Sequence, residues 1–209
     1  MKIVEYFASL QGEGMMIGLQ TYFIRTAGCN LHCSWCDTKY AQKLSDGRDM
    51  TVDQVMELVG DERSVCVTGG EPLEQPDIPE LLQRLVDAGK TVVLETNGSK
   101  DLSFVPDSDQ IIISMDIKCP SSDMQDSVYL SNLAVLTMKD QLKFIIADHR
   151  DLNYAERFLA EHPVHTNIIF SPVGGVDLKM LADEVVSKRM DVRVLPQLHK
   201  IIWGEKKGV

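Results

Sequence analysis

The chain has 209 residues, of which 44% are hydrophobic and 25% are charged. Lysine and arginine number 21 against 31 aspartates and glutamates, and the formal charge of −10 argues against a broad phosphate-binding surface and thus against nucleic acid as a partner. The apolar content excludes a disordered chain, and no run reaches the roughly 18 apolar residues of a membrane span. Residues Met1–Leu10 do not have the pattern of a signal peptide. We therefore expect a soluble, cytoplasmic protein with no membrane partner, folded as one domain over residues 1–209.

Short apolar runs alternate with amphipathic segments along most of the chain. The predicted strands are Leu19–Thr26, Ser64–Thr68, Thr91–Glu95, Gln110–Ser114, Gln141–Ala147, Asn167–Phe170 and Val192–Leu195. The predicted helices are Val52–Val59, Ile78–Ala88, Leu152–Glu161 and Leu178–Ser187, and a further helix within residues 121–140 is left open. Thr51 is the expected N-cap of the first helix. The alternation indicates a parallel sheet, either doubly wound or closed into a shortened (β/α) barrel, since a complete eightfold barrel needs about 250 residues.

Polar residues follow six of the predicted strands. The segments concerned are Arg25 with the loop after it, Thr68–Pro72, Glu95–Gly98, Ser114–Lys118, Ser171–Gly174 and Gln197–Lys200. Because the carboxyl ends of parallel strands meet at one rim, where ligands bind, we expect these segments to share one pocket.

Three of the five cysteines, Cys29, Cys33 and Cys36, lie within eight residues. In a reducing compartment such crowding favours metal or cluster ligation over disulfides. A [4Fe–4S] cluster held by three cysteines keeps one iron open, whereas a structural zinc ion needs four ligands. Candidates for a fourth ligand are His32, Cys66 and Cys119, of which Cys66 is interpreted as a core residue and Cys119 is left open. Inert thiols are the third alternative.

The cysteine spacing Cys-x3-Cys-x2-Cys, followed by Gly69-Gly70-Glu71-Pro72, resembles the signature of radical S-adenosylmethionine (SAM) enzymes. The resemblance implies that SAM binds the open iron through its amino and carboxylate groups. It also implies that an electron from the cluster cleaves SAM to a 5′-deoxyadenosyl radical, which abstracts hydrogen from the substrate. The fold expected from it is an α/β fold, a truncated and partly open (β/α) barrel of the radical SAM type.

Several residues at the predicted rim suit the parts of SAM. Gly69 and Gly70 would let the backbone approach the methionine moiety, Glu71 would balance its ammonium group, and Glu95 with Asn97 would bind ribose hydroxyls. The full set of SAM contacts that the resemblance implies is Trp35, Cys36, Asp37, Gly70, Glu71, Glu95, Asn97, Ser114, Asp116, Lys118, Ser171, Pro172, Val173 and Gly174. The simpler alternatives are an ordinary turn for the glycine pair and a solvated loop lysine for Lys118.

Three further segments resemble one family within this superfamily, the 7-carboxy-7-deazaguanine synthases of queuosine and archaeosine precursor synthesis. They are Ser9–Gly14 (SLQGEG), Cys36–Thr38 (CDT) and Gln197–Gly204 (QLHKIIWG). Arg25, which precedes Cys29 by four residues, adds to them, and the resemblance spans Glu5 to Gly204. Members of that family contract the ring of 6-carboxy-5,6,7,8-tetrahydropterin, release ammonia, use SAM catalytically and depend on Mg²⁺. The implied reaction begins with abstraction of hydrogen from C6 of the pterin.

The resemblance also implies roles for individual residues. Arg25 would bind the pterin carboxylate, which suits a guanidinium group, and Thr38 would be a ligand of Mg²⁺. The predicted substrate contacts are Leu10, Gln11, Gly12, Glu13, Arg25, Thr68, His199 and Val209. The cluster loop would span residues 29–38, and a C-terminal tail at about residues 196–209 would cap the substrate. No catalytic residue is predicted beyond these ligands.

The resemblance further implies a homodimer, and reduction of the cluster requires an electron donor such as flavodoxin. One alternative is a glycyl-radical-enzyme activase, which shares the cysteine and Gly-Gly-Glu-Pro motifs but is not expected to carry QGEG, CDT or QLHK. The other is a non-enzymatic iron–sulfur or zinc-binding protein, which leaves the rim segments without a role.

Overall fold

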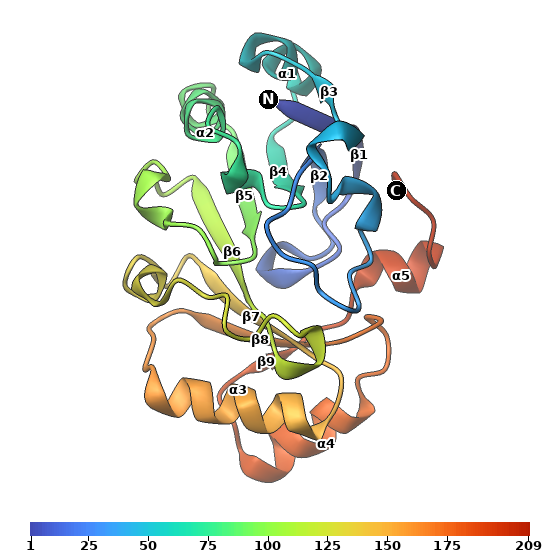
Figure 1. Cartoon of the computed structure of the whole chain (residues 1–209), viewed down its shortest axis with the longest axis vertical. Coiled ribbons are helices and arrows are strands. Elements are labelled where there is room, and N and C mark those ends of the chain that lie inside the picture. The colour runs from blue at the N-terminus through green and yellow to red at the C-terminus, as the bar shows by residue number, and fades with distance from the viewer.

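A computed structural model describes all residues from 1 to 209. Its centre is one nine-stranded sheet in the order β3-β1-β2-β4-β5-β6-β7-β8-β9 (Figure 1). The strands are β1 Lys2–Leu10, β2 Gln20–Thr26, β3 Arg48–Asp49, β4 Ser64–Gly69, β5 Thr91–Thr96, β6 Ile111–Ile117, β7 Gln141–Ile146, β8 Asn167–Pro172 and β9 Arg193–Val194. From β2 through β4 to β9 all neighbours are parallel, whereas β1 is antiparallel to β2 and β3 to β1. The sheet has two edges, β3 and β9, which confirms the predicted truncated and partly open barrel.

Four α-helices follow the predicted positions, and one was not expected. The helices are α1 Val52–Val59, α2 Ile78–Asp87, α3 His149–Glu161, α4 Lys179–Lys188 and α5 Leu198–Trp203. The Thr51 hydroxyl caps α1 by accepting a hydrogen bond from the Gln54 backbone N–H, as expected from its position before an apolar period. The open segment 121–140 forms only short 3-10 turns, Pro120–Ser122 and Leu130–Ala134. No helix in the structure is both long and apolar enough to cross a membrane.

The two faces of the sheet carry different side chains, because successive residues of a strand point to opposite sides. The outer face forms the main core of 29 buried residues with the helices, and there the Phe144 ring packs edge-on against Phe158 of α3. The inner face carries a small apolar cluster around Phe23 and polar side chains closer to the carboxyl ends of the strands. The curved inner face therefore has an apolar floor and a polar upper layer.

The strand β1 differs from the sequence prediction, which placed the first strand at Leu19. Only Ile3 among its residues is fully buried, so β1 has no buried face that alternates with an exposed one. Its sequence therefore lacks the alternation of apolar and polar residues that indicates a half-buried strand. It is held by pairing instead: Phe7 lies opposite Phe23 of β2, and their rings stack with centroids 5.2 Å apart. This pairing brings the segment Ser9–Gly14 to the mouth of the barrel.

Candidate active site

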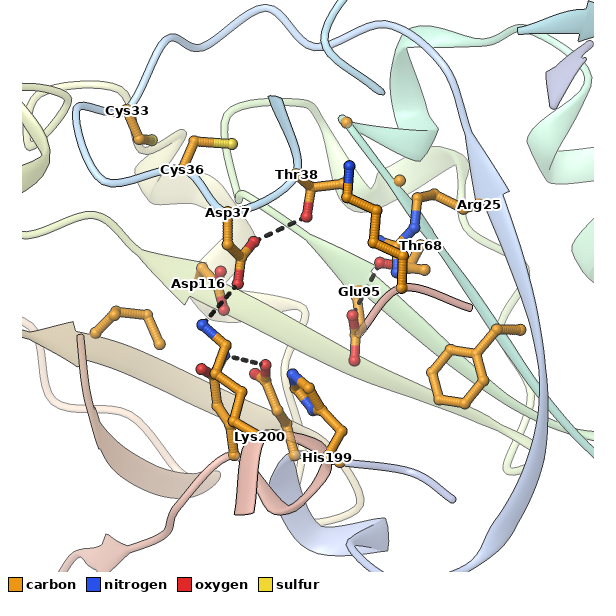
Figure 2. Close-up of a pocket in the computed structure, with 18 of the residues that line it drawn as sticks. Arg25, Cys33, Cys36, Asp37, Thr38, Thr68, Glu95, Asp116, His199 and Lys200 are labelled. Carbon is orange, nitrogen blue, oxygen red and sulfur yellow. Dashed lines mark hydrogen bonds and ion pairs between the residues drawn. The ribbon is translucent and has the colours of Figure 1, made fainter. Parts of the chain in front are cut away.

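One cavity of about 310 Å³ lies on the inner face at the carboxyl ends of the parallel strands. Its walls come from the end of β1, the cysteine loop, the ends of β2 and β4–β8, and the segment from α5 to the C-terminus (Figure 2). The convergence predicted for the rim segments is therefore present in the structure. All but three of the residues predicted to contact cluster, SAM, metal or substrate line this cavity; the exceptions are Glu71, Ser114 and Ser171.

The cysteine loop is fixed to the barrel at its base and near its tip. At the base, the backbone N–H groups of Gly28 and Cys29 donate to the carbonyl oxygens of Ala41 and Gln42 at 2.8 and 2.9 Å. Near the tip, the Trp35 indole donates to Ser121 Oγ at 2.9 Å. A loop without regular structure is thus held in place by the loops around it.

The donor set of this loop fits a cluster with one open iron. Cys29, Cys33 and Cys36 all line the cavity, and Cys29 Sγ accepts hydrogen bonds from the Leu31 N–H at 3.5 Å and the Asn97 amide at 3.7 Å. The candidates for a fourth ligand lie elsewhere: Cys66 and Cys119 are buried in apolar clusters, and His32 is exposed outside the cavity, so none completes a zinc site. No three His, Cys, Asp or Glu side chains surround a single ion position. Burial raises the pKa of both the Cys29 and Cys33 thiols.

The glycine pair at the end of β4, Gly69 and Gly70, is required by the chain's own packing. A Cβ on Gly70 would lie 2.2 Å from the Gly28 carbonyl oxygen, and one on Gly69 would lie 2.3 Å from Thr26 Oγ1. The Gly70 N–H donates to the Thr26 carbonyl at 3.1 Å. These glycines therefore join the end of β4 to the base of the cysteine loop, and Gly70 lines the cavity beside it.

Glu71 lies behind the cavity wall, so the structure does not show the ammonium contact expected from the sequence. Its carboxylate is fully buried and accepts hydrogen bonds from the Leu73 and Asn97 backbone N–H groups at 3.1 and 2.6 Å and from Thr96 Oγ1 at 2.8 Å. Burial raises its pKa to about 7, against the opposing effect of these donors. The group orders the turn that carries Asn97.

Ser114 and Ser171 are also buried behind the cavity lining, whereas the sequence predicts that both contact SAM. Ser114 Oγ accepts a hydrogen bond from Gln141 Nε2 at 2.6 Å, which occupies it within the barrel wall. The neighbouring residues that do reach the cavity are Asp116, Lys118, Pro172, Val173 and Gly174.

Arg25 points into the cavity from β2 and is oriented from behind by Glu5. Glu5 Oε1 accepts hydrogen bonds from Arg25 Nε at 2.7 Å and from the Tyr40 hydroxyl at 2.8 Å. Burial raises the pKa of Tyr40 to about 12, with a smaller contribution from the hydrogen bond to Glu5, although the nearby Arg25 acts in the opposite sense. The Tyr40 hydroxyl therefore stays protonated and acts as a donor. The terminal Nη nitrogens of Arg25 make no hydrogen bond to protein, which suits them to a ligand carboxylate.

The segments QGEG and QLHK meet across the open side of the barrel. The Leu198 N–H donates to the Gly12 carbonyl at 2.8 Å, and a Cβ on Gly12 would lie only 2.1 Å from Nδ1 of His199. Gly12 thus makes room for the His199 ring at the cavity. The six-residue helix α5 brings these groups together, although its short length gave no helical period to detect.

Asp37 and Thr38, at the end of the cysteine loop, lie on the side of the loop near His199 and Lys200 of α5 (Figure 2). Thr38 Oγ1 donates to Asp37 Oδ1 at 2.8 Å, and Lys200 Nζ lies 3.4 Å from Asp37 Oδ2. Burial would raise the pKa of Asp37, but the Thr38 hydroxyl and Lys200 outweigh it and hold the pKa below its ordinary value. An ionised carboxylate and a hydroxyl are oxygen donors of the kind that Mg²⁺ prefers.

The tail after α5 covers the cavity next to these residues. All residues from Gly204 to Val209 line it, and the Lys207 ammonium lies 4.1 Å from the centre of the Tyr40 ring. The tail therefore reaches the base of the cysteine loop from the opposite edge of the sheet.

One buried charge was missed by the sequence prediction. Lys143, in the middle of β7, lines the cavity with its side chain only 5% exposed. It donates to Glu13 and lies 3.2 Å from Asp116 Oδ1. A lysine inside the apolar run Gln141–Ile146 was the available signal, because lysine is almost never fully buried unless paired.

Comparison with known proteins agrees with this geometry. The Radical SAM superfamily model matches residues 23–133. The chain is also 40% identical, over the whole length of both proteins, to a 7-carboxy-7-deazaguanine synthase from Thermoplasma acidophilum. The chain belongs to the 7-carboxy-7-deazaguanine synthase family.

Other relatives and solved structures extend this result. A 7-carboxy-7-deazaguanine synthase from Methanospirillum hungatei is 43% identical over 97% of this chain and 85% of its own. In fold, the chain is similar to QueE from Escherichia coli, with a TM-score of 0.74 over 92% of each chain at 22% identity. The family and enzyme class predicted from the sequence are confirmed. This member is a radical SAM lyase, and its family implies a [4Fe–4S] cluster and SAM.

Proposed function

We propose that the protein converts 6-carboxy-5,6,7,8-tetrahydropterin to 7-carboxy-7-deazaguanine with loss of ammonia, using SAM catalytically and requiring Mg²⁺. The observation that carries the proposal is the placement of Arg25, which faces the same cavity as the three cysteines with its terminal nitrogens free of protein partners. A guanidinium in that state suits the carboxylate of the pterin.

The cysteine side of the cavity would hold the cofactors. Cys29, Cys33 and Cys36 supply three thiolates, and Gly70 and Asn97 line the cavity beside them, where SAM would lie. When bound, the cluster and SAM supply the radical chemistry that removes hydrogen from the substrate. The protein contributes orientation and exclusion of water, as is general for enzymes whose chemistry resides in a cofactor.

The opposite side would hold the pterin. Gln11, Glu13 and Thr68 present amide, carboxylate and hydroxyl groups that complement the donors and acceptors of its pyrimidine ring, and His199 lies across from Arg25. The terminal carboxylate of Val209 would close the site from the tail.

The Mg²⁺ ion would lie between the two sides at Thr38, with Asp37 held ionised next to it. Few protein ligands are needed, because Mg²⁺ keeps several waters and also accepts substrate oxygens. There the ion would polarise the pterin carboxylate.

The proposal extends to the assembly. We expect one radical SAM domain whose residues from about 196 to 209 cap the substrate, reduced by an electron-transfer protein such as flavodoxin and acting as a homodimer. Sedimentation of the reconstituted protein measures the dimer directly.

The test is anaerobic incubation of the reconstituted protein with dithionite, SAM, Mg²⁺ and the carboxytetrahydropterin. The expected products are 7-carboxy-7-deazaguanine and ammonia without net loss of SAM, and omission of Mg²⁺ should lower the rate. Cleavage of SAM without formation of the deazaguanine would contradict the substrate assignment, and an unchanged rate without Mg²⁺ would contradict the metal.

A further inference from the structure

Lys143 is the cation between the carboxylates of the inner face. Its Nζ pairs with Glu13 Oε2 and lies 3.2 Å from Asp116 Oδ1. Lys118 occupies the other oxygen of Asp116 at 2.7 Å. Lys143 is therefore the one ammonium group that forms an ion pair with Glu13.

Glu13 is held on both oxygens by residues far away in the chain. Gln197 Nε2 donates to Oε1 at 2.6 Å, while Lys143 binds Oε2. A carboxylate has about four acceptor sites, so two bound donors leave capacity for a ligand while fixing the plane of the group. The turn after β1, the strand β7 and the start of α5 are joined at this one side chain.

We propose that Lys143 is a positioning residue that holds the Glu13 carboxylate in the cavity as an acceptor for the N–H groups of the pterin. The inference rests on the proposed function, since it names what fixes one of the substrate contacts. Lys143, a strand residue in the barrel wall, thus contributes to substrate binding through Glu13.

The charges around Glu13 explain why a cation is needed there. The titratable groups around Glu13 and its partner Lys143 are Asp37, Glu95 and Asp116, with Lys118 on the other oxygen of Asp116 and His199 beside Gly12. Burial would raise the pKa of Glu13, but Lys143 and the Gln197 amide outweigh it and hold the pKa below its ordinary value. The pKa of Glu95, which forms no ion pair, is raised by burial and by the charge of Glu13, although the charge of Lys143 acts in the opposite sense. Without Lys143, the pKa of Glu13 should rise in the same way.

The test measures binding of 6-carboxypterin, an oxidised analogue that does not react, by quenching of its fluorescence between about pH 6 and pH 8. The variant Lys143→Met has nearly the length of lysine but no charge. Its Kd should be about tenfold higher than that of the wild type at the low end of this range, where Glu13 of the variant is protonated. The Kd should approach the wild-type value at the high end, where Glu13 is ionised, because the ionised fraction of a group falls about tenfold for each pH unit below its pKa. Parallel measurement of the wild type cancels the titration of the pterin itself.

Three variants separate charge from structure. Lys143→Arg keeps the cation and should keep the wild-type pH dependence, even where its affinity is lower. In the Glu13→Gln variant, adding Lys143→Met should introduce no further pH dependence of the Kd for 6-carboxypterin. Lys90→Met removes another buried lysine, whose Nζ donates to the Gly60 carbonyl at 2.6 Å away from the cavity, and should lower stability without changing the pH dependence of binding.

The outcomes are distinct. If the wild type binds 6-carboxypterin and Lys143→Met binds it with the same pH dependence, the inference is overturned and the proposed function stands. A pH dependence that persists in the double variant would assign the effect to Glu95 or Asp116 and also overturn the inference. If the wild type does not bind the pterin, both fail.

Discussion

The two sides of the cavity are built in different ways. The cysteine side is made of residues close in sequence and of backbone contacts, with three thiols on one loop and Gly70 packed against Gly28. The opposite side is made of charged groups paired over long separations, such as Glu13 with Lys143 across 130 residues and with Gln197 across 184.

The difference follows from what each side is proposed to bind. A cluster needs thiolates at short spacing on a loop, and close approach of the backbone needs glycine. A polar substrate in a barrel needs charged groups, and every buried charge needs a partner because an unpaired one costs several kcal/mol. Substitutions should therefore act on the cysteine side through loss of ligands or steric clash, and on the opposite side through charge.

The largest effect is expected at the cluster loop. Cys33→Ala should abolish both the visible absorbance of the reconstituted cluster and all turnover, because two thiolates cannot hold the cubane in place. The matched control is Cys66→Ala, which removes a small buried side chain from the floor of the barrel. It should lower the free energy of unfolding by about 1 kcal/mol and leave cluster content unchanged. A cluster retained in Cys33→Ala would show that another ligand is used.

The next effect tests the backbone contact on the same side. Gly70→Ala would place a Cβ 2.2 Å from the Gly28 carbonyl oxygen, so β4 and the cysteine loop must move apart. We expect a loss of about 3 kcal/mol in unfolding free energy, measured by denaturant titration, and weaker binding of SAM. Gly89→Ala is the control, since it has a positive φ of 72° and no neighbour within 4 Å and should cost only about 1 kcal/mol. Equal costs for the two variants would argue against the steric explanation.

On the opposite side, Arg25→Gln should raise the KM for the pterin about a hundredfold, because the substrate carboxylate loses its cation. Glu5→Gln leaves the guanidinium charge but weakens its orientation, and a smaller rise of about tenfold is expected from loss of a charge-assisted bond. Binding of SAM, monitored by the change that it causes in the cluster spectrum, should be unchanged in both variants. If both variants raised the KM equally, orientation rather than charge would dominate this side.

The smallest effect is expected at Glu71, where a substitution should change the pH dependence of the unfolding free energy. Its pKa in the folded protein is raised to about 7, so the native state binds more protons than the unfolded state between about pH 4.5 and pH 7, and this group lowers stability as the pH rises through that window. Relative to wild type, Glu71→Gln should therefore become more stable by about 2 kcal/mol on going from pH 5 to pH 8 in cluster-free protein. A stability difference that does not change with pH would show that the three donors keep Glu71 ionised.

Much of the fold could be predicted because its signals are local. The seven parallel strands and α1–α4 follow from apolar runs and helical periods within about ten residues, and Thr51 capped its helix as expected. The strand β1 and the helix α5 could not be predicted this way. The first lies beside the short edge strand β3 and has little burial, and the second has six residues, so both depend on partners supplied by the rest of the chain.

The same division applies to the site. By itself the sequence indicated the family and predicted three cluster ligands, because cysteines that hold a cluster lie at short spacing, and it determined the rim, because parallel strands end on one side. Only the tertiary structure decided that Glu71 supports a turn behind the wall, that Glu5 orients Arg25 and that Lys143 neutralises Glu13. These are pairings of buried charges and donors between distant segments, and their energies depend on burial and distance, which no local pattern encodes.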